Sequence, residues 1–150
     1  MIVSESTTLI VLLDVKREDL LSNLFDKLYI PKAVYDELNF KKDIELSSLF
    51  EVLEVQNKQK VKELQLSLDI GESEAIALAI EMNLPLIIDE KKGRKVAKNL
   101  GVKIVGLIGV LYLNIQRGYI KKQDAIEFLD LVISKGFRID KKLYDIIVSS

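Results

Sequence analysis

Short apolar segments alternate with helix-like patterns along the chain. The apolar segments lie near residues 2–4, 28–30, 86–88 and 102–105, and more residues separate them than a hairpin turn would need. Strands that are buried on both faces form short, continuous apolar runs of this kind, and parallel strands need long crossover connections. The pattern therefore predicts an α/β fold with a parallel sheet and helices on both of its faces.

The segments between these strands show apolar residues at helical spacing. We expect Ser6 or Thr7 to cap the first helix, Pro31 to occupy the first position of a helix that runs to about Asn39, and residues 52–55 to form an edge strand. Further helices are expected at residues 18–26, 61–68, 75–80, 107–116, 123–135 and 141–148, together with a basic helix that follows Asp89 and ends at Gly101.

Length and composition indicate one folded domain over residues 1–150. About 100 to 200 residues is the usual size of a domain, and the chain is 49% hydrophobic and 30% charged. The longest nearly apolar run, residues 104–113, is shorter than the roughly 18 to 20 residues of a membrane helix. The N-terminus carries an acid where a signal peptide carries Lys or Arg. We expect no membrane association and a cytoplasmic location.

The chain contains no cysteine and no histidine. This excludes disulfide scaffolds, zinc sites built from thiolate or imidazole, cysteine nucleophiles and serine–histidine catalysis. Carboxylate, lysine and hydroxyl chemistry remains. A bound metal would be held by oxygen atoms, which favours Mg²⁺ or Mn²⁺ over softer ions.

Acidic residues stand where the predicted strands and helices meet. Glu5 follows the first strand, and Asp89 and Glu90 follow the strand at 86–88. Glu74 begins an apolar helix, and Glu37 borders an apolar helix face. Ligands of parallel sheets bind at the carboxyl ends of the strands. Carboxylates brought together there would raise one another's pKa unless a cation lay among them.

Each acid also has a structural explanation, and the spacing leaves both open. Asp89 is placed to cap the basic helix, a contribution of about 0.5 to 2 kcal/mol. Glu37 would be a solvated helix residue, and Glu5 a turn acid. A negative charge in a first helical turn is favoured by the helix dipole, and this applies to Glu72, Glu74 and Glu90.

Several ordered segments resemble the PIN-domain family, in particular the compact prokaryotic group related to VapC-type toxins of toxin–antitoxin pairs. The resemblance lies in MIVSESTTLI, IPKAVYDEL, GESEAIALAIE, LIIDE with its basic helix, GLIGVL and GFRI. It implies a three-layer α/β/α sandwich with a short central parallel sheet and an acidic pocket for Mg²⁺ or Mn²⁺. It also implies hydrolysis of single-stranded RNA by a metal-activated water, a homodimer, and an antitoxin protein as a partner.

The resemblance assigns site residues one by one. The family's strand-one acid falls on Glu5, its second acid on Glu37, its helix-start acid on Glu74 and its late acid on Asp89. These four are the expected catalytic residues and metal ligands, and Glu90 is an additional metal ligand. The expected substrate-binding residues are Ser6, Lys91, Lys92 and Arg94.

One departure supports a second hypothesis. The family's first acid is usually Asp followed by Ser-Ser-Pro, but here Glu5 is followed by Ser6-Thr7-Thr8. The longer side chain moves the carboxylate by roughly 1.5 Å, and Mg²⁺ demands near-ideal octahedral geometry. The alternative is a catalytically degenerate PIN-like module that binds nucleic acid or a protein without cleavage. The basic run from Lys91 to Lys98 is likewise either a phosphate-binding surface or a solvated helix face.

Overall fold

The strands form one sheet in which every pairing is parallel. The computed structural model describes residues 1–42 and 45–150, and within them the strand order is β3-β2-β1-β4-β5. This confirms the predicted parallel α/β sheet. The strands are β1 Ile2–Ser4, β2 Leu28–Pro31, β3 Phe50–Leu53, β4 Leu86–Ile87 and β5 Ile104–Val105.

Helices occupy the connections between the strands and follow the last strand. They are α1 Ser6–Asp14, α2 Asp19–Ser22, α3 Lys32–Lys42, α4 Lys58–Leu64, α5 Ile70–Met82, α6 Lys91–Asn99, α7 Leu107–Gln116, α8 Lys122–Ser134 and α9 Lys141–Ser149. No helix in the described part of the chain is both long enough and apolar enough to span a membrane.

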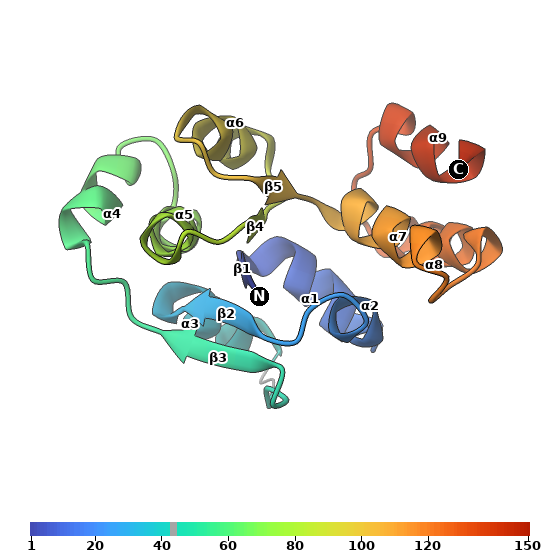
Figure 1. Ribbon diagram of the computed structural model, residues 1–150, viewed down its shortest axis with the longest axis horizontal. Coiled ribbons are helices and arrows are strands. Elements are labelled where there is room, and N and C mark those ends of the chain that lie inside the picture. The colour runs from blue at the N-terminus through green and yellow to red at the C-terminus, as the bar shows by residue number, and fades with distance from the viewer. Residues whose placement is uncertain (43–44) are drawn as a thin grey trace.

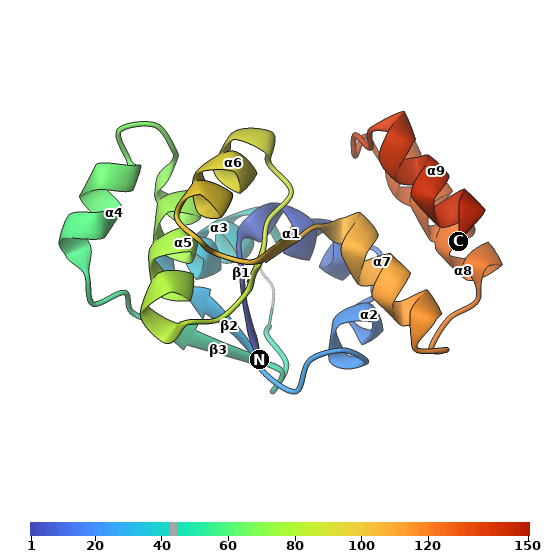
Figure 2. The same ribbon diagram turned by 45° about the horizontal axis from the view of Figure 1, so that its top comes forward.

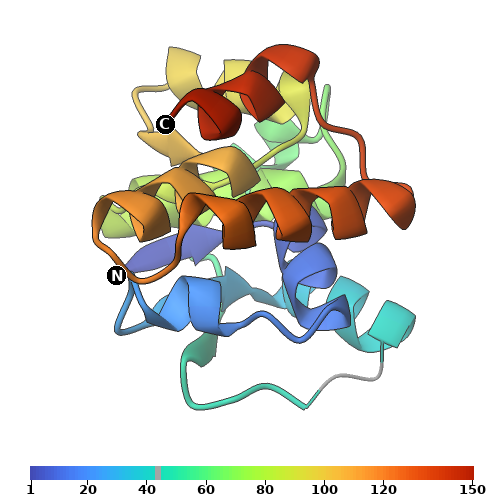
Figure 3. The ribbon, with the colours of Figure 1, turned by 90° about the vertical axis from the view of Figure 1, so that its right-hand side faces the viewer.

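The helices cover both faces of the sheet. Figure 1 shows α4, α5 and α6 on one side and α1, α2, α7, α8 and α9 on the other. Helix α3 packs against both α1 and α5, so it joins the two helical layers. Helices α7, α8 and α9 form a group at the end of the molecule opposite α4 (Figure 2) and lie in front of the sheet in Figure 3. The arrangement is the expected three-layer sandwich.

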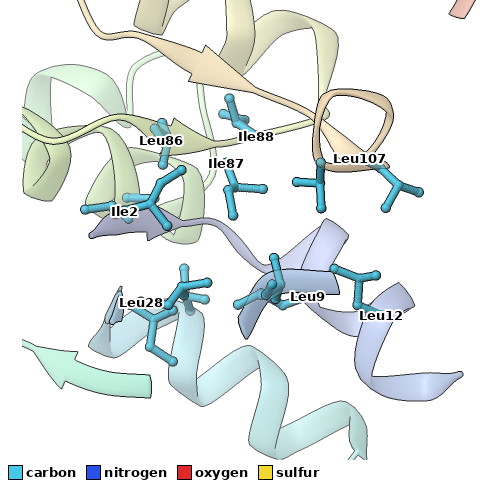
Figure 4. Packing of buried hydrophobic residues seen from close by; sticks show 14 of the residues in the cluster. Ile2, Leu9, Leu12, Leu28, Leu86, Ile87, Ile88 and Leu107 are labelled. Carbon is cyan, nitrogen blue, oxygen red and sulfur yellow. The ribbon is translucent and has the colours of Figure 1, made fainter. Parts of the chain in front are cut away.

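The core fills the space between the sheet and these helices. Ile2 and Ile87, on adjacent strands, are at most 1% exposed, and Leu9 and Leu107 contribute the facing sides of α1 and α7 (Figure 4). Burying a large aliphatic side chain contributes about 1.5 to 3 kcal/mol. Helices cover both faces of these strands, and this explains why the strand segments of the sequence are short and apolar throughout.

Four local predictions were wrong in their boundaries. Pro31 ends β2 and does not open a helix, and it pairs with Leu53 of β3 in the sheet register. The pairing of β2 with β1 ends at Tyr29, so Pro31 is paired on one side only, and proline is tolerated at such an edge position. The edge strand is Phe50–Leu53 and not residues 52–55. The helices expected at 18–26 and 61–68 are shorter or shifted, because the chain must turn into β2 and into α5 there.

The strand register brings two acidic residues to the same sheet edge. In the pairing of the central β1 with β4, Ser4 lies opposite Ile87. The amide of Glu5 still donates to the carbonyl of Ile87, at 3.1 Å. Glu5 and Asp89 thus leave neighbouring strands at their carboxyl ends, where α/β sheets build their sites.

Candidate active site

Glu5 is a buried carboxylate that caps α1. Its Oε2 accepts from the Thr7 amide at 2.7 Å and its Oε1 from the Thr8 amide at 3.2 Å, so the expectation that Ser6 or Thr7 caps this helix was wrong. The residue is 2% exposed. Burial raises the pKa of Glu5 to about 7; the two amides act downward, and the charge of Asp89 acts upward again. Glu5 is therefore a carboxylate that lacks a compensating positive charge.

Asp89 reaches across the sheet edge. Both of its carboxylate oxygens accept from the Leu107 amide, at 3.1 Å each, in the first turn of α7. Its Oδ2 also accepts from the hydroxyl of Thr8, and that hydroxyl lies 3.3 Å from Oε1 of Glu5. One hydroxyl thus joins the two carboxylates. The interpretation of Asp89 as the cap of the basic helix was wrong, because Glu90 caps α6.

Glu37 is held next to this pair by the residue that follows Glu5. The hydroxyl of Ser6 donates to Oε2 of Glu37 at 2.8 Å. The other carboxylate oxygen lies against Gly71 in the first turn of α5, where a Cβ on the glycine would overlap it. The N-terminal end of a helix favours a negative charge. Gly71 leaves room for the Glu37 carboxylate, and a larger residue here would displace that carboxylate from its position.

Glu74 is bound to the start of α3. Its Oε1 accepts from the amide of Ala33 at 2.9 Å, in the first turn of α3. Glu37 and Glu74 both line a surface pocket that also contains Lys32 and the exposed ring of Phe40. Thr8 thus links Asp89 to Glu5, the neighbouring Ser6 binds Glu37, and Glu74 shares a pocket with Glu37.

Comparisons with known proteins bear on the family and the fold of this chain. A family model described as DUF3368, PIN domain, matches residues 1–150. The chain belongs to the PIN-domain family. PIN domains are generally nucleases and typically use divalent metal ions. No curated protein matches the chain.

A solved structure shows the same fold. It is that of a PilT N-terminus domain protein from the hyperthermophilic archaeon Sulfolobus solfataricus P2, 24% identical, with a TM-score of 0.53. The superposition covers 77% of this chain and 94% of that one. At this identity the likeness supports the fold of the PIN domain, and the chemistry of the site has to be derived from the residues of this chain.

A second acidic group in this PIN domain is built around Glu90. Its carboxylate accepts from the amides of Lys92, at 3.1 Å, and Gly93, at 2.6 Å. Burial raises the pKa of the neighbouring Glu72 to about 8, and the charges of Asp69 and Glu90 add to the rise. Burial also acts upward on Glu90, but the amides of Gly93 and Lys92 outweigh it and lower the pKa of Glu90. Glu90 thus faces Glu72 and not Glu5.

Two of the three predicted phosphate-binding side chains lie near Asp89. Lys91 and Arg94 line the same pocket as Asp89, and the lining of that pocket does not include Lys92. Asp89 and Arg94 both approach the backbone at Gly106. A Cβ there would lie 2.5 Å from Oδ1 of Asp89 and 2.9 Å from Nη1 of Arg94, so the glycine leaves room for both side chains. The basic helix therefore presents only part of its positive charge to the PIN-domain acids.

The donor set of the site suits a hard divalent cation in its chemistry. All candidate ligands are carboxylates, and carboxylate oxygen is what Mg²⁺ and Mn²⁺ prefer. A positive charge would be most stabilising at the buried Glu5, because burial and the neighbouring Asp89 raise its pKa to about 7. Among residues 1–42 and 45–150, however, no three acidic side chains come together closely enough to hold one ion. Glu5 and Asp89 would hold a metal, with Glu37 next to them.

Thr8 is the site residue that sequence reasoning missed. It stands three positions after an acid that caps a helix, and the third helical position lies over the capping side chain. A hydroxyl at that position can therefore contact the capping carboxylate. Its second contact, with Asp89, depends on the pairing of β1 with β4 and leaves no local pattern in the sequence.

Proposed function

We propose that this PIN domain is a Mg²⁺- or Mn²⁺-dependent ribonuclease that hydrolyses single-stranded RNA. The observation that carries the proposal is the pair of carboxylates, Glu5 and Asp89, that meet at the hydroxyl of Thr8 on the carboxyl edge of the sheet. Glu37 is held beside them through Ser6. Membership in a family that generally contains nucleases supports the same conclusion.

In this proposal each residue has a separate task. Glu5 and Asp89 would hold the cation with Glu37 beside them, Glu74 adds a further carboxylate from α5, and Glu90 caps α6 next to Glu72. A bound divalent cation supplies Lewis-acid activation of water for in-line attack on the phosphodiester. Lys91 and Arg94 attract and orient the strand through its phosphates. Burial of Glu5 keeps bulk water away from the innermost ligand.

Cleavage of a labelled single-stranded RNA in the presence of Mn²⁺ tests the proposal. We expect Asp89→Asn and Glu37→Gln each to lower kcat/KM by at least about 100-fold, since loss of a group that stabilises transition-state charge costs that much. Lys122→Gln changes an exposed charge at the start of α8 and is the matched control. Unaltered cleavage in both acid variants would remove these residues from the site.

A specific observation favours a second function, a PIN-like module that binds RNA or a protein without cleaving it. Glu5 uses its carboxylate to cap α1, and the described residues bring no three acids together for one ion. Under this hypothesis Glu5→Asp shortens the side chain to the family's usual acid and switches on a nuclease that the native chain lacks. Calorimetry that finds both tight Mn²⁺ binding and turnover in the native protein rules this function out.

The proposal extends to assembly. We propose a homodimer, and an antitoxin protein that blocks the acidic edge in a toxin–antitoxin pair; both rest on the family resemblance. Light scattering on the purified protein measures the oligomer. Expression with and without the gene next to it on the chromosome, followed by growth measurement and co-purification, tests for the antitoxin. Normal growth on expression of the nuclease alone would argue against a toxin.

A further inference from the structure

A pocket next to Asp89 joins the acidic edge to the C-terminal segment. Its volume is about 370 Å³, within the size range of pockets that bind small molecules, and large enough for one nucleotide. The positive side chains around it are Lys91 and Arg94 from α6 and Arg138 from the connection between α8 and α9. Arg138 belongs to the GFRI segment, which the proposed function does not yet use.

The backbone on both sides of Arg138 is fixed. Helix α8 ends in a turn in which Gly136, at φ +99°, reverses the chain, the amide of Gly136 donates to the carbonyl of Ile133, and that of Phe137 to the carbonyl of Val132. This is the Schellman arrangement, and its left-handed position favours glycine. Two residues after Arg138, Asp140 caps α9 by accepting from the amide of Lys142 at 2.9 Å. Arg138 therefore stands on a short segment that is tied at both ends.

The charges of the pocket suit a phosphate. Within residues 1–42 and 45–150, neither Arg94 nor Arg138 forms an ion pair, so both guanidinium groups are available to a ligand. One of the two acids in the lining, Asp140, is occupied as a helix cap. Planar guanidinium groups bind phosphate through two parallel hydrogen bonds.

The lining of the pocket also includes a group of apolar side chains, which we call its floor. Ile108 of α7, Phe137 and Ile139 of the connection, and Leu143 of α9 form it. An acidic peptide would need polar partners along its backbone, which this floor does not offer. A nucleotide has a flat apolar base or sugar face next to a charged phosphate, and this combination matches the floor and the rim. The charge pattern and the floor together therefore favour a nucleotide.

We propose that this pocket binds one nucleotide of the substrate strand, with its phosphate at Arg138 and Arg94 and its base or sugar on the apolar floor. Arg138 is a substrate-positioning residue that holds the strand beside Asp89. The proposal rests on the proposed ribonuclease function. It adds the C-terminal segment to the site and predicts that the strand leaves the acidic edge toward α9.

Binding of a fluorescent single-stranded RNA of ten nucleotides, measured by anisotropy in EDTA at several salt concentrations, tests this inference without cleavage. We expect Arg138→Gln to weaken binding roughly tenfold and to reduce the salt slope by about 0.7, as for one phosphate contact on a single strand. Arg138→Lys keeps the charge and should recover part of the affinity. Arg117→Gln removes an exposed arginine at the end of α7, outside this pocket, and should stay within about twofold.

Cleavage in the presence of Mn²⁺ distinguishes a substrate-positioning role of Arg138 from a purely structural role. Arg138→Gln should raise KM with little change in kcat, because it removes binding that the ground state and the transition state share. Should Arg138→Gln fail to fold by circular dichroism, amide NMR shifts of the native protein decide. Addition of RNA should shift Phe137 to Asp140 and leave the amides around Arg117 in place.

The outcomes separate the two proposals. If the native protein binds and cleaves RNA but Arg138→Gln behaves like Arg117→Gln, or the 137–140 amides do not shift, the pocket proposal is overturned and the nuclease stands. If polyglutamate shifts the same amides with equal affinity, the pocket is a peptide site and the proposal is again overturned. If the native protein neither binds nor cleaves RNA, the ribonuclease proposal fails, and this inference fails with it.

Discussion

Two joints between a strand and a helix form the site, and they solve the same problem differently. At the β1–α1 joint one residue, Glu5, stands between the strand and the helix; it pairs with β4 through its amide and caps α1 through its carboxylate. At the β4–α6 joint the chain has two acids in succession. Glu90 caps α6, and Asp89 extends away from its own helix to Thr8 and to Leu107.

The difference shows what a second acid contributes. A helix start leaves amides that need an acceptor, and the nearest acid satisfies them first. Where that acid stands alone, its carboxylate remains turned toward its own helix and buried, as in Glu5. Where a second acid takes over the cap, the first is released to reach a neighbouring element, as in Asp89. The site therefore combines one constrained carboxylate with one extended carboxylate.

The largest expected effect concerns the constrained acid. Because the pKa of Glu5 is raised from 4.5 to about 7, the folded state binds this proton more tightly than the unfolded chain does. The contribution of this bound proton to the free energy of unfolding is fully present below pH 4.5 and is lost as the pH rises through 7. At about 1.4 kcal/mol per pKa unit, the free energy of unfolding in EDTA should fall by about 3 kcal/mol between pH 4.5 and pH 8.

Urea denaturation of native protein, Glu5→Gln and Glu72→Gln across this range measures the effect. Glu72, whose pKa is raised to about 8, adds a fall in the same direction, and its variant separates the two contributions. Glu5→Gln should lose the part of the slope that Glu5 contributes, and Glu72→Gln the part that Glu72 contributes. A native slope retained in Glu5→Gln would mean that Glu5 is already ionised in the fold and that the two joints do not differ electrostatically.

The next effect tests whether Asp89 has been released for metal binding. Mn²⁺ at 100 times its dissociation constant should stabilise the native protein by about 2.7 kcal/mol. Asp89→Asn keeps an oxygen for the Leu107 amide but loses a negative charge, and most of this stabilisation should disappear. Glu90→Gln keeps an oxygen for the α6 amides and should retain it. Thermal unfolding with and without Mn²⁺ gives both values, and equal losses in the two variants would contradict the division of tasks.

The link between the joints should have a smaller effect. Thr8→Val preserves the shape of a fully buried side chain and removes the hydroxyl that joins Glu5 to Asp89. A hydrogen bond to a charged group contributes about 1.5 to 3 kcal/mol, so the variant should lose about 2 kcal/mol of unfolding free energy. Thr8→Ser keeps the hydroxyl and is the control. If valine is as stable as serine, the carboxylates do not depend on this bridge.

Sequence reasoning succeeded where the burial pattern determined the structure. The apolar runs at 2–4, 28–30, 86–88 and 102–105 predicted the positions and parallel direction of four strands, because strands covered on both faces need no polar positions. It also placed Glu5 and Asp89 at one edge. The family resemblance was confirmed by the family model.

Sequence reasoning failed at the helix caps, where two adjacent residues could each serve as the cap. Whether Glu5 or Ser6, and whether Asp89 or Glu90, caps a helix depends on the residue at which the backbone leaves the strand. That point is set by pairing with a distant strand. Thr8 on Asp89 and Gly71 on Glu37 are likewise contacts between remote segments. Local spacing carries no information on such contacts, so the ligand set stays a prediction until a metal is bound.

The smallest expected effect isolates the cap itself. Glu90→Ala removes the acceptor for the amides of Lys92 and Gly93, and loss of an N-cap costs about 1 kcal/mol. It also removes a negative charge beside Glu72, so part of this loss should be offset at about pH 8 and above, where Glu72 ionises. Glu90→Asp keeps the cap and should be near neutral. Urea denaturation at pH 6 and pH 8 measures the stability, and RNA cleavage at pH 7 should change less than twofold. A large loss of cleavage in Glu90→Ala with a normal Glu90→Asp would show that the α6 cap also holds Asp89 in place, so that the two tasks at this joint are coupled.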